Sequence, residues 1–508
     1  MSDLAALLVV VPLLGALGSM IAGLIREESG WPVAVVVLAV QVALAAAFAA
    51  RGLGGDPSGY AVGGFQPPIG IELLIDGLTA TMVVLVAAVA LGVLAYARRA
   101  GPRSNRFYAT YLLLVTGLTG MSITGDAFNM YVFLEITGLT AYALVASGDR
   151  GRSAVAGLKY LLVGTFGASL YLLGVGYAYV ATGTLNMGDL AVQLADVGYA
   201  SPLVRASFAF VVVGLFVKVA MFPLHTWQPG AYAGAPDSVS ALIAALVSTV
   251  SAYALVRIVL TVFTPEFLSA VPFARTLLAA TAAVSIVVGS LLAVAQTEIK
   301  RMLAYSSVSQ FGLIVAALSV ANGTALVGLA VHLVGHAVMK GGLFLTAGLV
   351  STGTGGRSVA DYDGLADRMP VAAAAFGALA LAMVGVPPAI GFLGKWYIVV
   401  GTLEAGAWSL AVVILLSTLL TLAYFARLVE RMFFRAASDA DAVGDGPDTG
   451  EVPGTAEPTG ATVATDGGRV SLGMYAAVAA ATLLALGLGA AVPAYESALA
   501  PTIEVLLS

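Results

Sequence analysis

The sequence contains no cysteine, and this absence excludes several kinds of chemistry. The chain has no disulfide, no thiol nucleophile and no thiolate ligand for an iron–sulfur cluster. It also has no glycine loop of the Walker or Rossmann type, which hold nucleotide phosphates. The basic residues are scattered, so the net charge of −5 indicates no nucleic-acid partner. We therefore expect no cofactor, no bound metal and no nucleic acid.

Charge is also scarce, and this determines the class of protein. Of 508 residues, 10% are charged and 60% hydrophobic, with a mean hydropathy of +0.98, as expected for a chain embedded in the lipid bilayer. The N-terminal stretch MSDLAALLVVVPLLGALGSM has no basic region and no cleavage site, which indicates a retained first span. Apolar runs long enough to cross a bilayer predict an all-α polytopic protein of about 14 transmembrane helices. They lie near 4–25, 32–50, 73–97, 107–125, 127–147, 156–182, 206–227, 238–262, 274–297, 302–321, 324–350, 370–402, 407–434 and 470–493.

The basic residues predict the orientation. Arginine clusters at 98–106 and 427–435 fall on one side of the predicted bundle, which the positive-inside bias assigns to the cytoplasm. Few basic residues fall on the other side: Arg51, Arg205, Arg257 and Arg275. This pattern predicts that both termini lie outside and that arginine is confined to loops. Residues 436–468 contain seven acidic residues and no basic one among Gly, Pro, Ala and Thr, which predicts a disordered cytoplasmic linker.

Three ionisable residues share one predicted helix. His332, His336 and Lys340 are spaced four residues apart, so they lie on nearly the same face of a helix. The segment from 302 to 356 around them has no Asp, Glu or Arg, and an ionisable group within a membrane is costly and usually functional. One histidine alone is as often a packed core residue. Three such groups in a line favour proton transfer.

Other isolated charges accompany predicted helix breaks. Glu135 and Lys218 are the only charges in their spans and form the natural opposite-charge pair. Pro223 follows Lys218, and Pro387 with Pro388 precedes Lys395, which predicts two interrupted helices of the kind that line transporter cavities. Simple packing kinks are the alternative for the prolines. For His225, beside the first break, hydrogen bonding to the freed carbonyls is an equally good explanation.

Eight stretches carry a resemblance to a known family. They are PPIGIELLIDGLTATM, TGDAFNMYVFLE, AGLKYLLV, TGTLNMGDLA, PLHTWQPGAYAGAPDSVSAL, EIKRMLAYSSVSQFG, HLVGHAVMKGGLFL and PPAIGFLGK, within about residues 65–400. The chain resembles the antiporter-type subunits shared by complex I and Mrp cation/proton antiporters, especially the Mrp D type. The resemblance implies two inverted five-helix repeats with broken helices 7 and 12. It also implies that Glu135, Lys218, Lys340 and Lys395 occupy the family's ionisable positions, and that many relatives share His336.

The resemblance divides the chain into five parts, and six further residues are predicted to support the pathway. The parts are helices 1–3 (1–105), a first repeat (106–262), a second repeat (263–435), the linker (436–468) and a last helix (469–508). Asp126, Pro223, His225, Pro387, Ser248 and Thr249 are expected to support the pathway. One position departs from the family, because Thr249 stands where relatives usually carry a lysine in helix 8. Water held by Ser248, Thr249 and Ser251 would then have to carry the relay.

The predicted function is that of an ion-transport subunit rather than an enzyme. Protons would be taken up at Glu135 and Lys218, cross helix 8, and pass His332, His336 and Lys340 to Lys395. The driving reaction would be exchange for Na⁺ or another monovalent cation, in a multi-subunit complex of a prokaryotic plasma membrane. The alternative is the membrane arm of a complex I-like oxidoreductase, such as a quinone reductase or a membrane hydrogenase. A scaffold subunit without conduction is a third possibility, if the loss of the lysine at 249 abolishes transport.

Overall fold

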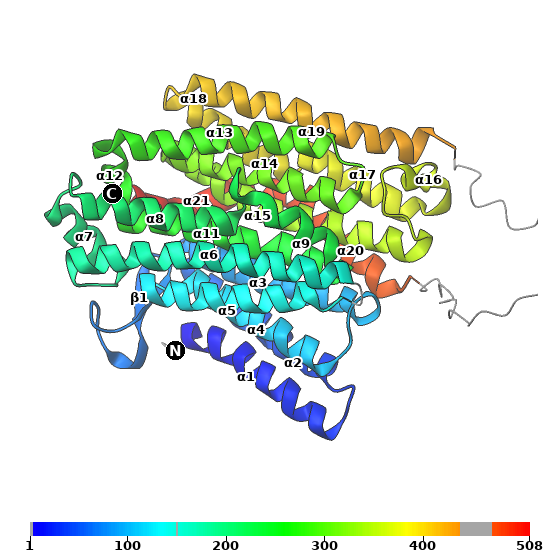
Figure 1. Ribbon diagram of the computed structural model, residues 1–508, viewed down its shortest axis with the longest axis horizontal. Coiled ribbons are helices and arrows are strands. Elements are labelled where there is room, and N and C mark those ends of the chain that lie inside the picture. Colours follow the sequence, from blue (N-terminus) through cyan, green and yellow to red (C-terminus); the bar gives the residue numbers. More distant parts are fainter. Residues whose placement is uncertain (1–3, 149–150, 437–469) are drawn as a thin grey trace, which may run out of the picture.

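The fold is a bundle of long helices that run side by side along the longest axis of the molecule (Figure 1). The computed structural model describes residues 4–148, 151–436 and 470–508. Within these residues, twelve helices are long and apolar enough to cross a membrane. Two further predicted crossings are α4 (Asn105–Ile123) and the interrupted pair α17 (Pro370–Val384) and α18 (Ile390–Glu404). The structure therefore agrees with the predicted polytopic helical fold.

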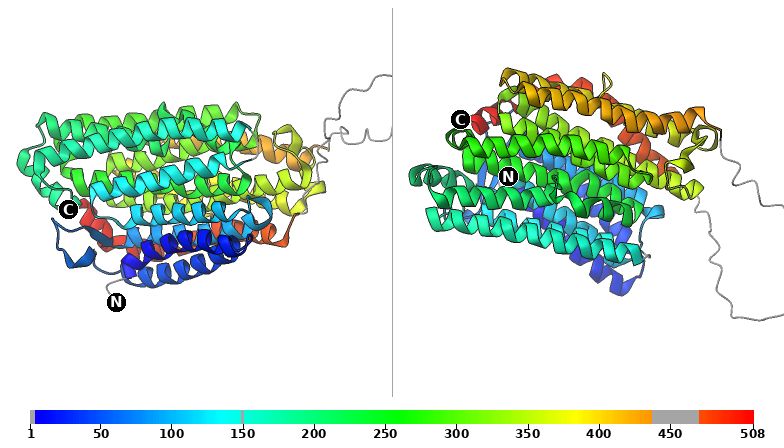
Figure 2. Two further views of the ribbon diagram at one scale, coloured as in Figure 1. Left: turned by 60° about the horizontal axis from the view of Figure 1, so that its bottom comes forward. Right: turned by 45° about the horizontal axis from the view of Figure 1, so that its top comes forward.

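The N-terminal helices lie along one flank of the bundle. They are α1 (Leu4–Ile25) and α2 (Gly30–Gly52), which stay at the lower edge in both turned views (Figure 2) and lie opposite α19 (Trp408–Phe434) in Figure 1. A hairpin of β1 (Ser58–Ala61) and β2 (Glu72–Ile75) follows, with the 3-10 turn η1 (Val62–Gly64) between the strands, and leads into α3 (Gly77–Ala100). The predicted helix 73–97 was wrong at its start, because residues 72–75 pair as a strand and Asp76 caps α3.

A first run of five crossings follows. Its third helix is long, its fourth is interrupted after Val219, and its fifth contains two π-helical turns, which the sequence did not predict. The elements are α4, α5 (Ala127–Ala146), α6 (Gly151–Thr182), the short α7 (Met187–Val197), α8 (Pro202–Val219), η2 (Leu224–Trp227) and α9 (Gln228–Gly234), then α10 (Asp237–Leu242), η3 (Ile243–Val247), α11 (Ser248–Ile258), η4 (Val259–Phe263) and α12 (Thr264–Ala270).

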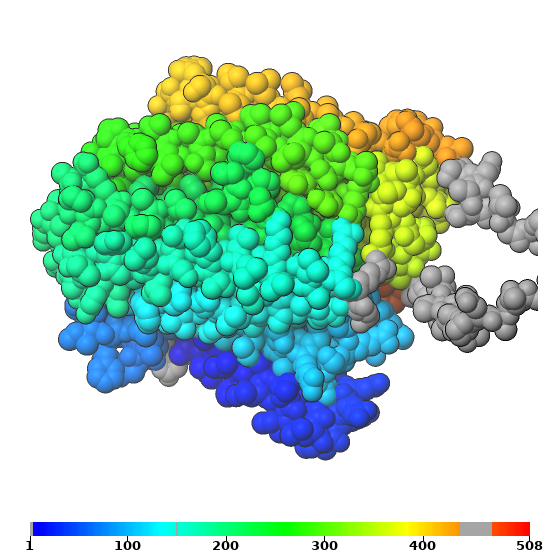
Figure 3. All heavy atoms as spheres, viewed as in Figure 1, coloured from blue at the N-terminus to red at the C-terminus, as the bar shows by residue number. Residues whose placement is uncertain are grey.

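A second run of five crossings repeats this pattern. Its third helix is again long, and its fourth is interrupted between Val384 and Ile390. The elements are α13 (Pro272–Val294), α14 (Ile299–Val320), α15 (Gly323–Thr354), η5 (Ala360–Tyr362), α16 (Leu365–Arg368), α17, α18 and α19. Because five is odd, the second run enters the bundle from the opposite side, which is the expected inverted repeat. On the surface the two runs form neighbouring bands in sequence order (Figure 3).

The last crossing is longer than predicted. It comprises α20 (Leu472–Gly487), η7 (Leu488–Ala491) and α21 (Val492–Leu507), whereas the predicted helix ended at 493. Pro493 lies in the first turn of α21, where a proline leaves no hydrogen bond unmade, so it does not end the crossing. The predicted linker 436–468, apart from Ala436, lies outside the described residues. Both termini lie toward one end of the bundle (Figure 1), which we call the Asp76 end; the opposite one is the Asp237 end.

Candidate functional site

The predicted pair Glu135–Lys218 is present between α5 and the last turn of α8. The Lys218 ammonium lies 3.8 Å from the Glu135 carboxylate and donates a hydrogen bond of 3.1 Å to the Tyr142 hydroxyl. Tyr142 lies two turns along α5 from Glu135, on the same face. A Cβ on Gly164 would collide with the Tyr142 hydroxyl, so only glycine leaves room for it. Lys218 therefore has one charged and one neutral partner.

The break after α8 exposes backbone groups that other side chains satisfy. Ala220 adopts a left-handed conformation (φ 65°), and Phe216 accepts hydrogen bonds from the amides of Ala220 and Met221. The Trp227 indole donates to the Val217 carbonyl at 2.8 Å. His225 stacks on Phe222 instead, at 5.3 Å between ring centroids. Trp227 therefore satisfies the Val217 carbonyl, and the polar contact of His225 is with the backbone of Pro223, inside the break.

An aromatic and hydroxyl column leads from this break toward the centre of the bundle. The Tyr160 ring stacks on Trp227 at 4.0 Å and meets the Tyr142 ring edge-on at 4.5 Å. Farther in, the Tyr232 hydroxyl lies 3.0 Å from the Ser248 hydroxyl, to which the Gln228 amide also donates at 3.3 Å. Ser248 directly follows the π turn η3, a local irregularity that often marks functional sites.

Thr249 connects this column to the second run. Its hydroxyl lies 3.3 Å from Nδ1 of His336, so the departure from lysine leaves a neutral hydrogen bond across the interface of the two runs. Nε2 of His336 and both ring nitrogens of His332 are buried without a partner among the described residues. Buried polar atoms are normally paired, and water is the usual partner where protein groups are lacking. Beside the bridge, these three nitrogens therefore face no protein donor or acceptor among the described residues.

The predicted stripe on α15 is present and wholly buried. His332, His336 and Lys340 all have 0% exposure, one turn apart from each other. Lys340 reaches α14, where its ammonium donates to the Leu303 carbonyl at 2.8 Å and to the Ser306 hydroxyl. No carboxylate pairs with Lys340 among the ion pairs of the described residues. An ammonium held only by neutral groups gives up its proton more easily than a paired one.

Lys395 uses the second helix break. Its ammonium donates to the carbonyls of Met383 and Val384 at 2.8 and 3.0 Å, at the C-terminal end of α17. These carbonyls are free because the chain leaves the helix at Gly385 and passes through Pro387 and Pro388 before α18 begins. The negative end of the α17 dipole also favours a cation there. The break therefore creates the site that the lysine occupies.

Two sequence predictions receive a structural explanation. Asp126 caps α5, accepting the Asn129 amide at 2.6 Å, and partial burial raises the pKa of its carboxyl despite the lowering effect of that bond. The prediction that arginine is confined to loops was wrong for Arg257: it lies buried in α11, and its guanidinium contacts both Asp76 oxygens at 2.8 and 2.9 Å. Arginine is thus not confined to loops, because a buried partner compensates its charge.

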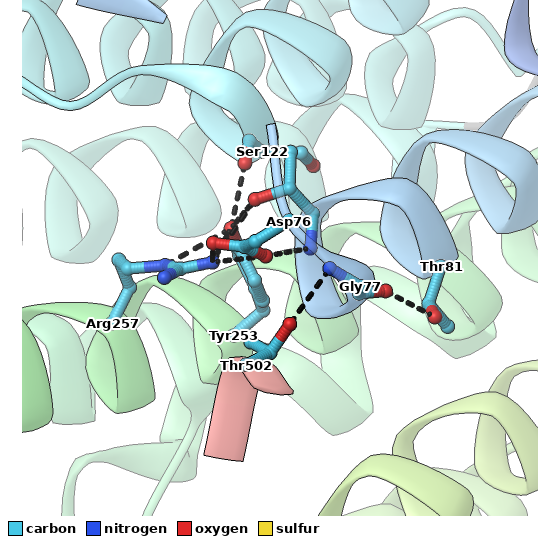
Figure 4. Close-up of polar contacts among 8 residues, drawn as sticks. Asp76, Gly77, Thr81, Ser122, Tyr253, Arg257 and Thr502 are labelled. Carbon is cyan, nitrogen blue, oxygen red and sulfur yellow. Dashed lines mark hydrogen bonds and ion pairs between the residues drawn. The ribbon is translucent and has the colours of Figure 1, made fainter. Parts of the chain in front are cut away.

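The Arg257–Asp76 pair is the centre of a network at the Asp76 end (Figure 4). The Arg257 guanidinium also donates to Thr79 at 2.9 Å and to Tyr253 at 3.1 Å, and Tyr253 donates to the Ser122 carbonyl at 2.7 Å. The Gly77 amide donates to Thr502 of α21 at 2.8 Å. Sequence reasoning missed this network. The spacing of Thr249, Tyr253 and Arg257 at four-residue intervals was the available signal, since it places all three on one helix face.

The chain is similar to proteins of one family. Residues 124–421 match the family described as NADH:quinone oxidoreductase/Mrp antiporter, TM. The chain is 46% identical to the N-type subunit of the NADH-quinone oxidoreductase of Desulforudis audaxviator, over 88% of this chain and 89% of that one. It is 32% identical to the D-type subunit of the Na(+)/H(+) antiporter of Bacillus subtilis, over 73% and 75%. A chain of the membrane-bound sulfane sulfur reductase, an archaeal respiratory membrane complex, superposes with a TM-score of 0.87 at 29% identity, covering 100% of this chain and 98% of that one.

Proposed function

Because the chain belongs to the NADH:quinone oxidoreductase/Mrp antiporter transmembrane family, we propose that it is the proton-translocating subunit of a multi-subunit Na⁺/H⁺ antiporter. At the coarser level it is an antiporter-like, proton-conducting membrane subunit. The observation that carries the proposal is a row of titratable groups spread over both runs: the buried Lys218, His336, Lys340 and Lys395, with the half-buried Glu135 paired to Lys218.

The mechanism follows from the partners of each lysine. Lys218 is held charged while Glu135 lies close, and separation of the pair frees its proton. The proton then crosses by way of Ser248 and Thr249 to His336, which Thr249 contacts directly. Lys340 and Lys395 pass it onward through water, and the free carbonyls of α17 hold the Lys395 side chain in place.

The proposed orientation places the Asp237 end in the cytoplasm. The positive-inside bias of the sequence supports it, because the arginine clusters border that end. Both termini and the Arg257 network would then face outward, and the acidic segment 436–468 would be cytoplasmic. The complex would reside in a prokaryotic plasma membrane with other membrane subunits.

A second function is favoured by a specific observation. The 46% identical relative carries the name of an NADH-quinone oxidoreductase subunit, whereas the antiporter relative is 32% identical. In this second function the same lysines move protons, and electron transfer in partner subunits supplies the energy. The two functions differ in the driving reaction and share the pathway through this chain.

A transport assay separates the two functions. The purified complex is reconstituted into proteoliposomes with a pH-sensitive dye inside, and internal pH is recorded after a NaCl pulse or after an electron donor and quinone. A response to Na⁺ without a donor supports the antiporter. A response only to the donor and quinone supports the oxidoreductase, and no response to either contradicts both.

A further inference from the structure

A further ion pair, largely covered, lies where the two runs meet at the Asp237 end. Lys300, in the first turn of α14, pairs with Asp237, the first residue of α10. The Lys300 ammonium also donates to the Ala235 carbonyl and the Ser240 hydroxyl, each at 3.0 Å. The two side chains are 12% and 16% exposed, so the pair is largely covered but reachable.

Two cavities border Asp237. A cavity of about 300 Å³ is lined by Arg152, Ser153 and Arg357, and it reaches the surface because both arginines are exposed. A second cavity of about 10 Å³ is lined by Lys300, Ser351 and Arg357, and holds about one water molecule. Asp237 and Arg357 line both cavities, so the aspartate separates an open space from a water-sized one.

Two buried hydroxyls indicate that water occupies this region. Tyr362 lines the smaller cavity, and its hydroxyl has no partner among the described residues. The Tyr96 hydroxyl is also buried without a partner, and a Cβ on Gly348 would lie 2.6 Å from both that hydroxyl and the Asp237 side chain. Buried hydroxyls beside a carboxylate and next to a water-sized cavity are the usual setting of ordered water.

The smaller cavity lies beside the same helices, α14 and α15, that hold Lys340. On α15, Ala347 and Ser351 line the smaller cavity, and Lys340 lies on the same face, seven residues from Ala347 or about 10 Å along the axis. On α14, the Leu303 carbonyl that binds Lys340 lies one turn from Lys300. Helices α14 and α15 therefore connect the Asp237–Lys300 pair with Lys340 without passing Thr249.

We propose that Asp237 and Lys300 form a second proton inlet, which loads Lys340 directly from the Asp237 end; this rests on the proposed function. An excess proton from the solution enters the open cavity as hydronium and passes to the Asp237 carboxylate, leaving neutral water behind and weakening the pairing of Asp237 with Lys300. The proton then passes through water to the free amine of Lys340, and Asp237 returns to its charged form. The second run thereby receives protons although position 249 has no titratable group.

Proton flux tests the inlet in the whole complex. In proteoliposomes of a Lys218→Arg complex, which lacks the first uptake site, Asp237→Asn should reduce the remaining flux about a hundredfold, as loss of a general acid–base group does. Asp363→Asn is the matched control, because Asp363 forms an ion pair of 3.0 Å with Arg431 outside both cavities. Equal flux in the Asp237→Asn and Asp363→Asn complexes would overturn the inlet.

A comparison with Lys395→Arg keeps the two proposals apart. If that variant abolishes flux while Asp237→Asn does not, the inlet fails and the proposed function stands. If Lys395→Arg leaves flux intact, the proposed function itself fails. A folding defect is recognised by loss of the intact complex on size-exclusion chromatography, and Asp237→Glu, which keeps the carboxylate, should recover part of the flux.

Water access is measured independently of transport. Because the chain has no cysteine, a single Ser351→Cys substitution gives this chain one thiol. A small, charged, membrane-impermeant methanethiosulfonate should label it only from the Asp237 side of the membrane. Ser417→Cys on α19, buried at 1% exposure and outside the cavities, should stay unlabelled. An unreactive Ser351→Cys, or labelling only from the Asp76 side, would overturn the inlet.

Discussion

Asp76→Asn should destabilise the chain through the buried pair alone. Asparagine still caps α3, because its side-chain oxygen accepts the Thr79 amide as Asp76 does at 2.8 Å. The charge is lost, however, and the Arg257 guanidinium, which contacts both Asp76 oxygens, stays buried without a counter-charge. Breaking a buried pair from one side costs about 3–5 kcal/mol. We expect a loss of stability in this range.

The double variant distinguishes the charge from the packing. Arg257→Met alone leaves Asp76 charged and buried, so it should also be destabilising. The double variant Asp76→Asn with Arg257→Met has no uncompensated charge, and replacing both partners of a buried pair is often nearly neutral. It should therefore be more stable than either single variant, a coupling that a double-mutant cycle measures.

The assay is heat denaturation of the purified complex in detergent. The fraction that remains intact after heating is read by size-exclusion chromatography at matched times, because such unfolding is often irreversible. The order of midpoints should be wild type, double variant, then the two single variants. A wild-type midpoint for Asp76→Asn would refute the reasoning, and so would a double variant whose loss equals the sum of the single losses.

Three further predictions concern the pathway and the orientation. Tyr142→Phe keeps the ring against Tyr160 but removes the hydroxyl that Lys218 donates to, a bond to a charged group worth about 1.5–3 kcal/mol, so proton flux should fall about tenfold or more; unchanged flux would exclude Tyr142 as a partner of the lysine. In a complex that already carries Asp237→Asn, Thr249→Val should remove most of the remaining proton flux, whereas Thr249→Ser should be tolerated. Equal flux in the Thr249→Val and Thr249→Ser complexes would mean that the bridge does not pass Thr249. A protease should cut the segment 436–468 in inverted vesicles and leave it intact in right-side-out vesicles; the reverse would overturn the orientation.

Some parts of the site could be predicted from the sequence because charged residues are rare in this chain. In a chain with 10% charged residues, an isolated Glu135 and Lys218 have few alternative partners, and their pairing is confirmed at 3.8 Å. The prolines beside Lys218 and Lys395 predicted both helix breaks, because a proline in a helix interior removes a backbone donor and clashes with the preceding turn. The spacing of the α15 stripe needed only the helical period. The breaks and the stripe depend on local chemistry, and the pair could be predicted because its two spans hold no other charge.

The parts that were missed depend on contacts between distant segments. Arg257 and Asp76 are 181 residues apart, and no local pattern brings them together. The carbonyls that hold Lys395 become visible only when the direction of the chain after Gly385 is known. The end of the last crossing was missed for a different reason. A proline disrupts a helix in its interior but is tolerated in the first turn, and Pro493 lies in the first turn of α21.

The most direct test of the central claim is proton flux through a Lys395→Arg complex in proteoliposomes. Arginine keeps the charge and the donors that bind the carbonyls of α17, but it does not release its proton in proteins. Lys159→Arg, an exposed lysine of α6, is the matched control. If this chain moves protons through its buried lysines, flux disappears in Lys395→Arg and persists in Lys159→Arg. Wild-type flux through the Lys395→Arg complex would contradict the account.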